Sequence, residues 1–151
     1  MQVCEIMRHD PVVCFPEDTA EAAARTMAEQ HTGILPVVKR GSGGKLVGIV
    51  TDRDICLRVV AEGRDPKKVK VSECMTSSPV CCGPRDDVQF AMLLMREHQV
   101  RRIPVVDADH RVGGILSFSN LVNTQCNAES LVDTFRLTCY PANRSMIVTR
   151  L

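Results

Sequence analysis

Residues 5–38 read EIMRHDPVVCFPEDTAEAAARTMAEQHTGILPVV, and residues 73–106 read ECMTSSPVCCGPRDDVQFAMLLMREHQVRRIPVV. The two stretches align without a gap when each residue is matched to the one 68 positions further along the chain. The same residue occupies both copies at Met7/Met75, Pro11/Pro79, Val12/Val80, Cys14/Cys82, Pro16/Pro84, Asp18/Asp86, Ala23/Ala91, Met27/Met95, Glu29/Glu97, Pro36/Pro104, Val37/Val105 and Val38/Val106. This register indicates an internal duplication, and two copies predict a pair of similar units related by a pseudo-two-fold axis.

The local pattern predicts the same β-α-β-β-α order in both copies. In the first copy we expect an extended run at 11–14, a helix capped by Asp18 or Thr19, strands at 34–38 and 46–51, and a helix at 52–61. In the second we expect an extended run at 80–82, a helix near 86–98, strands at 102–107 and 112–117, and a helix near 119–125. The strands are almost continuously apolar, which is typical of sheets covered by helices. The predicted fold class is therefore mixed α/β (α+β), with two tandem units.

The duplication also divides the chain. We assign residues 1–62 to the first unit, 63–71 to a polar linker that contains Pro66, and 72–125 to the second unit. The tail, residues 126–151, has no counterpart in the first unit. Its stretches 130–139 and 145–148 are mildly β-prone, and they could add strands, cover a sheet edge or serve a partner.

Composition limits the function classes that are open to the chain. It has 151 residues, 44% of them hydrophobic and 25% charged, which are ordinary globular values. A half of this size is marginal alone, so the halves should share an interface. With no Trp and one Tyr, the chain lacks the aromatics of a base-stacking nucleic-acid platform. The net charge of +1 gives no strong attraction to nucleic acid or membrane.

No apolar stretch approaches the roughly 20 residues that span a bilayer, and residues 1–11 lack the apolar centre of a signal peptide. We therefore expect a cytoplasmic protein. Its eight cysteines form no C-x-x-C pair, so we expect no metal site and mostly small buried thiols, with Cys81 and Cys82 the pair to watch. The four histidines are scattered, and no catalytic order stands out, so we expect no enzyme and no catalytic residues.

The duplicated motifs resemble a known family. Residues 5–38 followed by GKLVGIVTDRDI (44–55) resemble one CBS domain, and residues 73–106 followed by GGILSFSNL (113–121) resemble a second. The resemblance covers roughly residues 3–125 and is similar to small stand-alone bacterial proteins that consist of a CBS pair, or Bateman module. It implies a regulatory, signal-transducing module that holds AMP, ADP, ATP, NAD or S-adenosylmethionine between its domains, requires no cofactor and forms a homodimer.

The resemblance also implies a ligand site. The family motif G-h-h-[T/S]-x-x-[D/N] falls on residues 48–54, where Thr51 would offer a hydroxyl to phosphate or ribose and Asp54 would accept the ribose hydroxyls. A helix N-terminus behind them favours a phosphate. The alternative interpretation is that Thr51 or Asp52 only caps a helix and that Asp54 lies in its first turn.

The second unit would complete this site from the residues just before its Pro-Val-Val. The guanidiniums of Arg101 and Arg102 can bind phosphate oxygens, with Arg53 and Lys45 as further candidates. Alternatively, both arginines lie at a solvated strand entrance. The residues expected against adenine, which could equally be plain core, are Ile49, Val100, Pro79, Val80 and Cys81.

The matching second cleft looks poorer from the sequence. It would use Ser117 and Asn120, so that a neutral amide replaces the carboxylate, and residues 32–35 would stand in place of the arginine pair. We expect no cation to face a phosphate there. One competent site and one weak, empty or adenosine-only site follow. The alternative function is a CBS-pair dimer that binds no nucleotide and acts as a protein-interaction or thiol-responsive protein.

Overall fold

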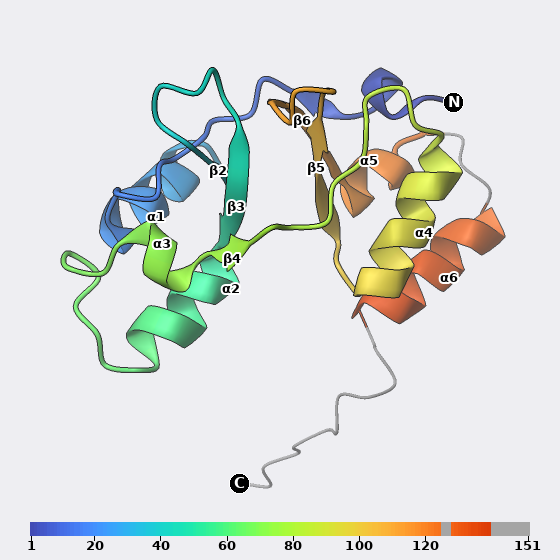
Figure 1. Ribbon diagram of the computed structural model, residues 1–151. Helices are drawn as coiled ribbons and strands as arrows, with labels where there is room; N and C mark the ends of the chain where they lie inside the picture. The colour runs from blue at the N-terminus through green and yellow to red at the C-terminus, as the bar shows by residue number, and fades with distance from the viewer. Residues whose placement is uncertain (125–127, 140–151) are drawn as a thin grey trace, which may run out of the picture.

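Two antiparallel sheets face each other across the middle of the molecule, and the helices lie on their outer sides (Figure 1). The computed structural model describes residues 1–124 and 128–139. One sheet has the order β2 (Ile34–Val38), β3 (Leu46–Thr51) and β4 (Thr76–Ser77). The other has the order β1 (Arg8–His9), β6 (Val112–Ser117) and β5 (Arg102–Val106). This mixed α+β pair confirms the predicted fold class.

The helices follow the duplication closely. The β2–β3–β4 sheet packs with α1 (Ala20–Glu29), the short α2 (Asp52–Ile55) with a π-helical turn η2 (Cys56–Val60), and α3 (Val71–Cys74). The β1–β6–β5 sheet packs with η1 (Val3–Glu5), α4 (Val88–His98), α5 (Phe118–Val122) and α6 (Ala128–Cys139). The extended runs predicted at 11–14 and 80–82 form single parallel bridges, from Cys14 to Val37 and from Cys82 to Val105.

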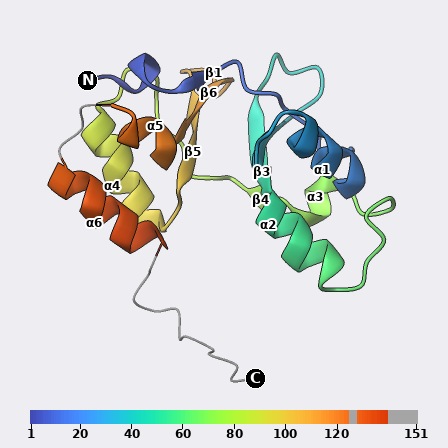
Figure 2. The same cartoon turned by 180° about the vertical axis from the view of Figure 1, so that it is seen from behind.

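The leading segments of the two units are exchanged. The N–H of Val3 donates to the carbonyl of Asp86 (3.0 Å), and the N–H of Val71 donates to the carbonyl of Asp18 (2.8 Å). Strand β1 then pairs with β6, and β4 pairs with β3 (Figure 2). Each sheet is thus completed by a strand that the sequence assigns to the other unit.

The cores show the same exchange. The first core, which includes Leu35 and Val50, also takes in Val69 and Val71 from the predicted linker and Cys74 from the start of the second unit. The second core, around Met92, Met95 and Ile103, takes in Val3 from the N-terminus. The packing units therefore differ from the boundaries 1–62 and 72–125, which follow the repeat in the sequence. The cores are aliphatic, as expected from the scarcity of aromatic residues.

The stretch 130–139, interpreted from its composition as β-prone, is helical and forms most of α6. This helix packs against α4 and α5, and it buries Thr134 and Thr138. An amphipathic pattern with a three-to-four-residue period explains the outcome, because a helix needs only one apolar face to dock. The stretch 145–148 lies outside the described residues. Within the described part of the chain, no helix has the length and apolarity that crossing a membrane requires.

Two strand glycines permit the exchanged strands to approach. A Cβ on Gly48 would lie 2.7 Å from Met75 Sδ and 2.9 Å from the carbonyl oxygen of Thr76. A Cβ on Gly114 would meet Met7 Sδ and the carbonyl oxygen of Arg8 in the same way. The glycine of the G-h-h-[T/S] motif is therefore explained by strand packing, independently of any ligand.

We predict that Gly48→Ala destabilises the chain by about 1–3 kcal/mol, because the added methyl group is forced against backbone. Gly113→Ala is the matched control, since no atom lies within 4 Å of its Cβ position and it stands in β6. Its cost should stay within about 0.5 kcal/mol. Denaturant midpoints at constant m-value measure both. Equal midpoints for the two variants would contradict the packing role.

Candidate functional site

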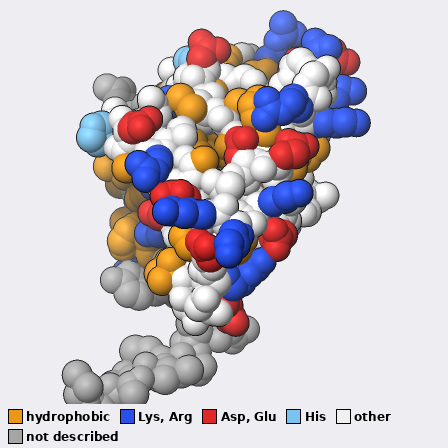
Figure 3. Space-filling model, turned by 90° about the vertical axis from the view of Figure 1, so that its left-hand side faces the viewer, with side chains coloured by type: hydrophobic (Ala, Val, Ile, Leu, Met, Phe, Trp, Pro, Cys, Tyr) orange, Lys and Arg blue, Asp and Glu red, His pale blue; other side chains and the backbone are white. Residues whose placement is uncertain are grey.

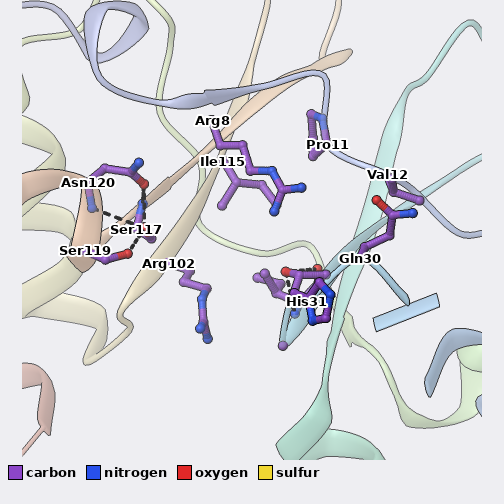
Figure 4. Close-up of a pocket in the computed structure, with 13 residues that line it drawn as sticks. Arg8, Pro11, Val12, Gln30, His31, Arg102, Ile115, Ser117, Ser119 and Asn120 are labelled. Carbon is purple, nitrogen blue, oxygen red and sulfur yellow. Dashed lines mark hydrogen bonds between the residues drawn. The ribbon is translucent and has the colours of Figure 1, made fainter. Parts of the chain in front are cut away.

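Two clefts lie between the units. The first cleft has a volume of about 340 Å³ and is lined by Ile34, Ile49, Thr51, Asp52, Arg53, Gln99, Val100, Arg101, Arg102, Thr138 and Cys139. The second cleft has a volume of about 220 Å³ and is lined by Arg8, Pro11, Val12, Gln30, His31, Thr32, Gly33, Ile34, Arg102, Ile115, Ser117, Ser119 and Asn120 (Figure 4). Their walls come from both units, as the pseudo-two-fold arrangement requires.

Six of the candidate residues meet in the first cleft. Strand β3 provides Ile49 and Thr51, α2 provides Arg53, and the start of β5 with the two residues before it provides Val100, Arg101 and Arg102. Burial alternates along strand β3: Leu46, Gly48 and Val50 are buried, while the positions between them are half-buried. This alternation turns Ile49 and Thr51 away from the first core and toward the cleft.

Thr51 and Asp54 cap the helix that follows β3. The Thr51 hydroxyl and N–H both donate to Asp54 Oδ2, at 2.7 Å and 2.9 Å, and the Asp54 N–H donates to Thr51 Oγ1 at 3.1 Å. Asp54 Oδ1 lies 3.6 Å from Nη2 of Arg58. The carboxylate is thus occupied by a capping box and an ion pair, and Asp54 does not line the cleft. In this structure Thr51 and Asp54 act as helix-capping residues, which was the alternative to a ligand-binding role.

The other adenine-side candidates lie elsewhere. Pro79, Val80 and Cys81 line neither cleft, whereas their counterparts Pro11 and Val12 line the second. Thr138 and Cys139, at the end of α6, contribute to the wall of the first cleft instead. Lys45 also lies outside both clefts; it forms an antiparallel bridge with Arg111 between the two hairpin turns.

The second cleft corrects one expectation from the sequence. No cation was expected there, yet Arg8 and Arg102 both line it, and Figure 4 shows Arg8 lying beside Ile115. The strand exchange is the reason, because β1 carries Arg8 from the start of the first copy onto β6. Ser117 and Asn120 do lie in this cleft, joined by a capping box like that of Thr51 and Asp54.

Sequence reasoning missed several lining residues. Gln99 and His31 are matched positions of the duplication, and both follow a helix with positive φ, 54° and 49°. That shared place after each helix is a signal that could have identified them. Arg8 carried no such signal, because pairing between β1 and β6 joins segments more than a hundred residues apart.

Three arginines that line the clefts have no carboxylate partner in the part of the chain that the structure describes. On the outer face of the first unit, basic and acidic side chains are interspersed (Figure 3), and ion pairs such as Arg25 with Glu21 (3.0 Å) form there. Among the described residues, no carboxylate lies within ion-pair distance of Arg8, Arg101 or Arg102. Unpaired guanidiniums facing a cleft create a positive potential that suits an anionic ligand.

The thiols vary in burial. Cys14, Cys74 and Cys82 are buried, Cys56 is exposed, and the others among the described residues are half-buried; Cys126 lies outside them. Only three of the seven described cysteines are buried, so the expectation that most of them are buried is wrong for this part of the chain. Burial raises the pKa of Cys81 to about 11, and burial together with the Asp86 charge raises that of Cys82 to about 12. A raised pKa keeps a thiol protonated and weakly nucleophilic at neutral pH.

A pair of polar clefts between two pseudo-symmetric α+β units defines a ligand-binding module, in which side chains from both units can surround one small molecule. The CBS domain family matches residues 3–61 and 71–125, and the chain belongs to this family.

Relatives of similar size agree with this assignment. The CBS domain-containing protein YhcV of Bacillus subtilis is 40% identical over 115 residues, covering 76% of this chain and 79% of YhcV. The CBS domain protein PAE2072 of Pyrobaculum aerophilum, solved in complex with AMP, has a TM-score of 0.77 and 25% identity, over 89% of this chain and 98% of that one. The CBS domain pair of protein MJ0100, in complex with 5-methylthioadenosine and S-adenosyl-L-methionine, has a TM-score of 0.73 and 26% identity, over 81% and 93%.

We predict that Cys81 is slow to alkylate in the folded chain. With a pKa of about 11, roughly a thousandth of this thiol is ionised at pH 8, so its labelling rate should keep rising with pH toward 11. Exposed Cys56 should label first. Iodoacetamide labelling followed by peptide mass mapping measures both, with unfolded chain as control. Labelling of Cys81 at pH 7 as fast as Cys56 would overturn this and favour the thiol-responsive alternative.

Proposed function

We propose that the chain is a non-enzymatic cytoplasmic sensor that binds an adenosine-containing ligand, such as AMP, ADP, ATP, NAD or S-adenosylmethionine, between its CBS domains. One observation carries the proposal. In the first cleft the unpaired guanidiniums of Arg101 and Arg102 stand beside an apolar wall that includes Ile49 and Val100. A positive end and an apolar wall match the phosphate and the base of a nucleotide. The complexes of PAE2072 and MJ0100 support this ligand class.

The roles of the individual residues follow from their chemistry. Arg101 and Arg102 bind phosphate, the Thr51 hydroxyl binds phosphate or ribose, and Ile49 and Val100 pack against adenine. Asp54 does not line the cleft, so its carboxylate must turn toward the ligand on binding to accept the ribose hydroxyls with the lone pairs that its capping box and ion pair leave available. Pro79, Val80 and Cys81 line neither cleft, so an adenine contact from them requires that segment to move inward on binding.

The second cleft is proposed as the weaker site. Its capping pair ends in the Asn120 amide, which is a poorer acceptor for ribose hydroxyls than an ionised carboxylate. Arg8 and Arg102 can nevertheless bind a phosphate there, so the second cleft is proposed to take phosphorylated ligands as well as adenosine.

A homodimer is also proposed for this chain. A hexameric CBS-CP12 protein from bloom-forming cyanobacteria, 31% identical with a TM-score of 0.73 over 82% of this chain and 70% of that one, supports self-assembly. Titration calorimetry with adenosyl ligands separates the sensor function from the alternative in which the chain acts through protein interaction alone. The absence of heat and of thermal shift with AMP, ATP, NAD and S-adenosylmethionine would favour the protein-interaction alternative.

We predict that Arg101→Ala weakens AMP binding by about 10-fold to 100-fold, because a charge-assisted hydrogen bond contributes about 1.5–3 kcal/mol. Adenosine, which has no phosphate, should bind as it does to the unaltered chain. Arg85→Ala removes the same charge from an exposed position outside both clefts and should change neither ligand. Calorimetry at one fixed ionic strength gives the constants. Equal losses for AMP and adenosine in Arg101→Ala would exclude a phosphate role.

We predict that Asp54→Ala weakens adenosine and AMP by a similar factor, about tenfold, because both ligands carry the ribose hydroxyls. The variant should also lose about 1 kcal/mol of stability with its helix cap. Thr19→Ala, which removes the cap of α1 away from the clefts, separates the two effects, since it should lose stability and keep affinity. Unchanged affinity in a destabilised Asp54→Ala chain would leave Asp54 as a cap alone.

A further inference from the structure

The two clefts share a wall. Ile34 and Arg102 occupy matched positions of the duplication, at the first residue of β2 and of β5, and each lines both clefts. Ile34 is apolar and buried, whereas Arg102 is half-buried and cationic. The pseudo-symmetric wall therefore carries a guanidinium on one side only.

Among the residues that the structure describes, Arg102 is the only charged one that borders both cavities. Arg101 and Arg53 line the first cleft and not the second, and Arg8 lines the second and not the first. The Arg102 guanidinium has no ion-pair partner among the described residues, so nothing in that part of the chain holds it to one side. In Figure 4 its side chain extends into the space between the β6–α5 hydroxyls and His31.

We propose that Arg102 is a single phosphate-binding cation shared by the two clefts, so that phosphorylated ligands bind to them anticooperatively; this rests on the function proposed above. A guanidinium gives its bidentate pair of N–H donors to one phosphate at a time. The first phosphorylated ligand takes Arg102 together with the arginines that line its own cleft alone, which are Arg53 and Arg101 in the first cleft and Arg8 in the second. The second ligand is left without Arg102, so it binds more weakly than it would to an otherwise empty chain.

This sharing makes the pair respond to phosphorylation of its ligands. Two uncharged adenosyl ligands do not compete for Arg102, and both clefts fill independently. Two phosphorylated ligands do compete, so the chain is half-filled over a wide range of concentration. Binding equilibria of this kind are reciprocal, so each ligand weakens the other by the same factor.

A test must separate sharing from two clefts that simply differ in affinity. Each cleft is filled in turn with a tryptophan at an exposed lining position, Arg53→Trp for the first and Ser119→Trp for the second. Adenosine stoichiometry by calorimetry should then fall from two per chain to one, which shows that the cleft is filled. AMP affinity is measured in each background with Arg102 and with Arg102→Ile, a side chain that the matched position already accommodates.

Sharing predicts that Arg102→Ile weakens AMP about 10-fold to 100-fold in both filled backgrounds. It also predicts that the second AMP binds the unaltered chain more weakly, by about the same factor, than the weaker single-cleft background binds it. With Arg102→Ile alone this excess should vanish. Direct repulsion between two phosphates predicts the opposite, because removing a cation between them would increase the excess.

The remaining outcomes overturn the inference in distinguishable ways. A loss in only one background would show that Arg102 belongs to one cleft. A single adenosine per unaltered chain would show that the second cleft is not a site. Binding of S-adenosylmethionine without any binding of AMP would remove the shared phosphate and leave the proposed function standing. No binding of any adenosyl ligand would remove the proposed function, and the inference with it.

Discussion

The structure depends on the exchange of leading segments between the two halves of the duplication. Val3 is fully buried in the core of the second unit, and Val71 is fully buried in the core of the first. Backbone hydrogen bonds from Val3 to Asp86 and from Val71 to Asp18 fix both segments in place. A half-chain of this size buries too little surface to fold well by itself. Exchange solves that problem reciprocally, because neither core is complete without a segment from the other half. The pair is therefore a single cooperative structure.

The exchange also determines what the clefts contain. By pairing β1 with β6 it places Arg8 on the second cleft, and by pairing β4 with β3 it requires glycine at position 48. The G-h-h-[T/S] motif thus combines two demands. Its glycine serves the packing of strands, while its hydroxyl residue caps a short helix and faces the cleft. A ligand that uses Thr51 must share it with the capping box, so binding and local helix stability are linked.

The sequence predicted the fold well because the duplication tested every local pattern twice. The helices at α1 and α4 and the strands β2, β3, β5 and β6 were all predicted within a few residues. The sequence also predicted that Thr51, Arg101 and Arg102 share one cleft, and all three line the first cleft. What it could not predict depends on long-range pairing: the exchanged strands, Arg8 in the second cleft, and the contribution of α6 to the first. The tail has no second copy to compare, so the prediction that 130–139 is β-prone rests on composition alone and is wrong.

Duplication produces two equal clefts, and only substitution can make them differ. Within each of the matched pairs Asp54/Asn120 and Ile34/Arg102 the two residues differ in charge, but the two pairs have different effects. The first pair makes the clefts differ, since Asp54 belongs to the capping box of α2 beside the first cleft and Asn120 to that of α5 beside the second. The second pair lies in the common wall, so a cation placed there couples the clefts instead of distinguishing them. A module that has both changes can rank its two sites through Asp54 and link their occupancy through Arg102. The symmetric ancestor implied by the repeat could do neither.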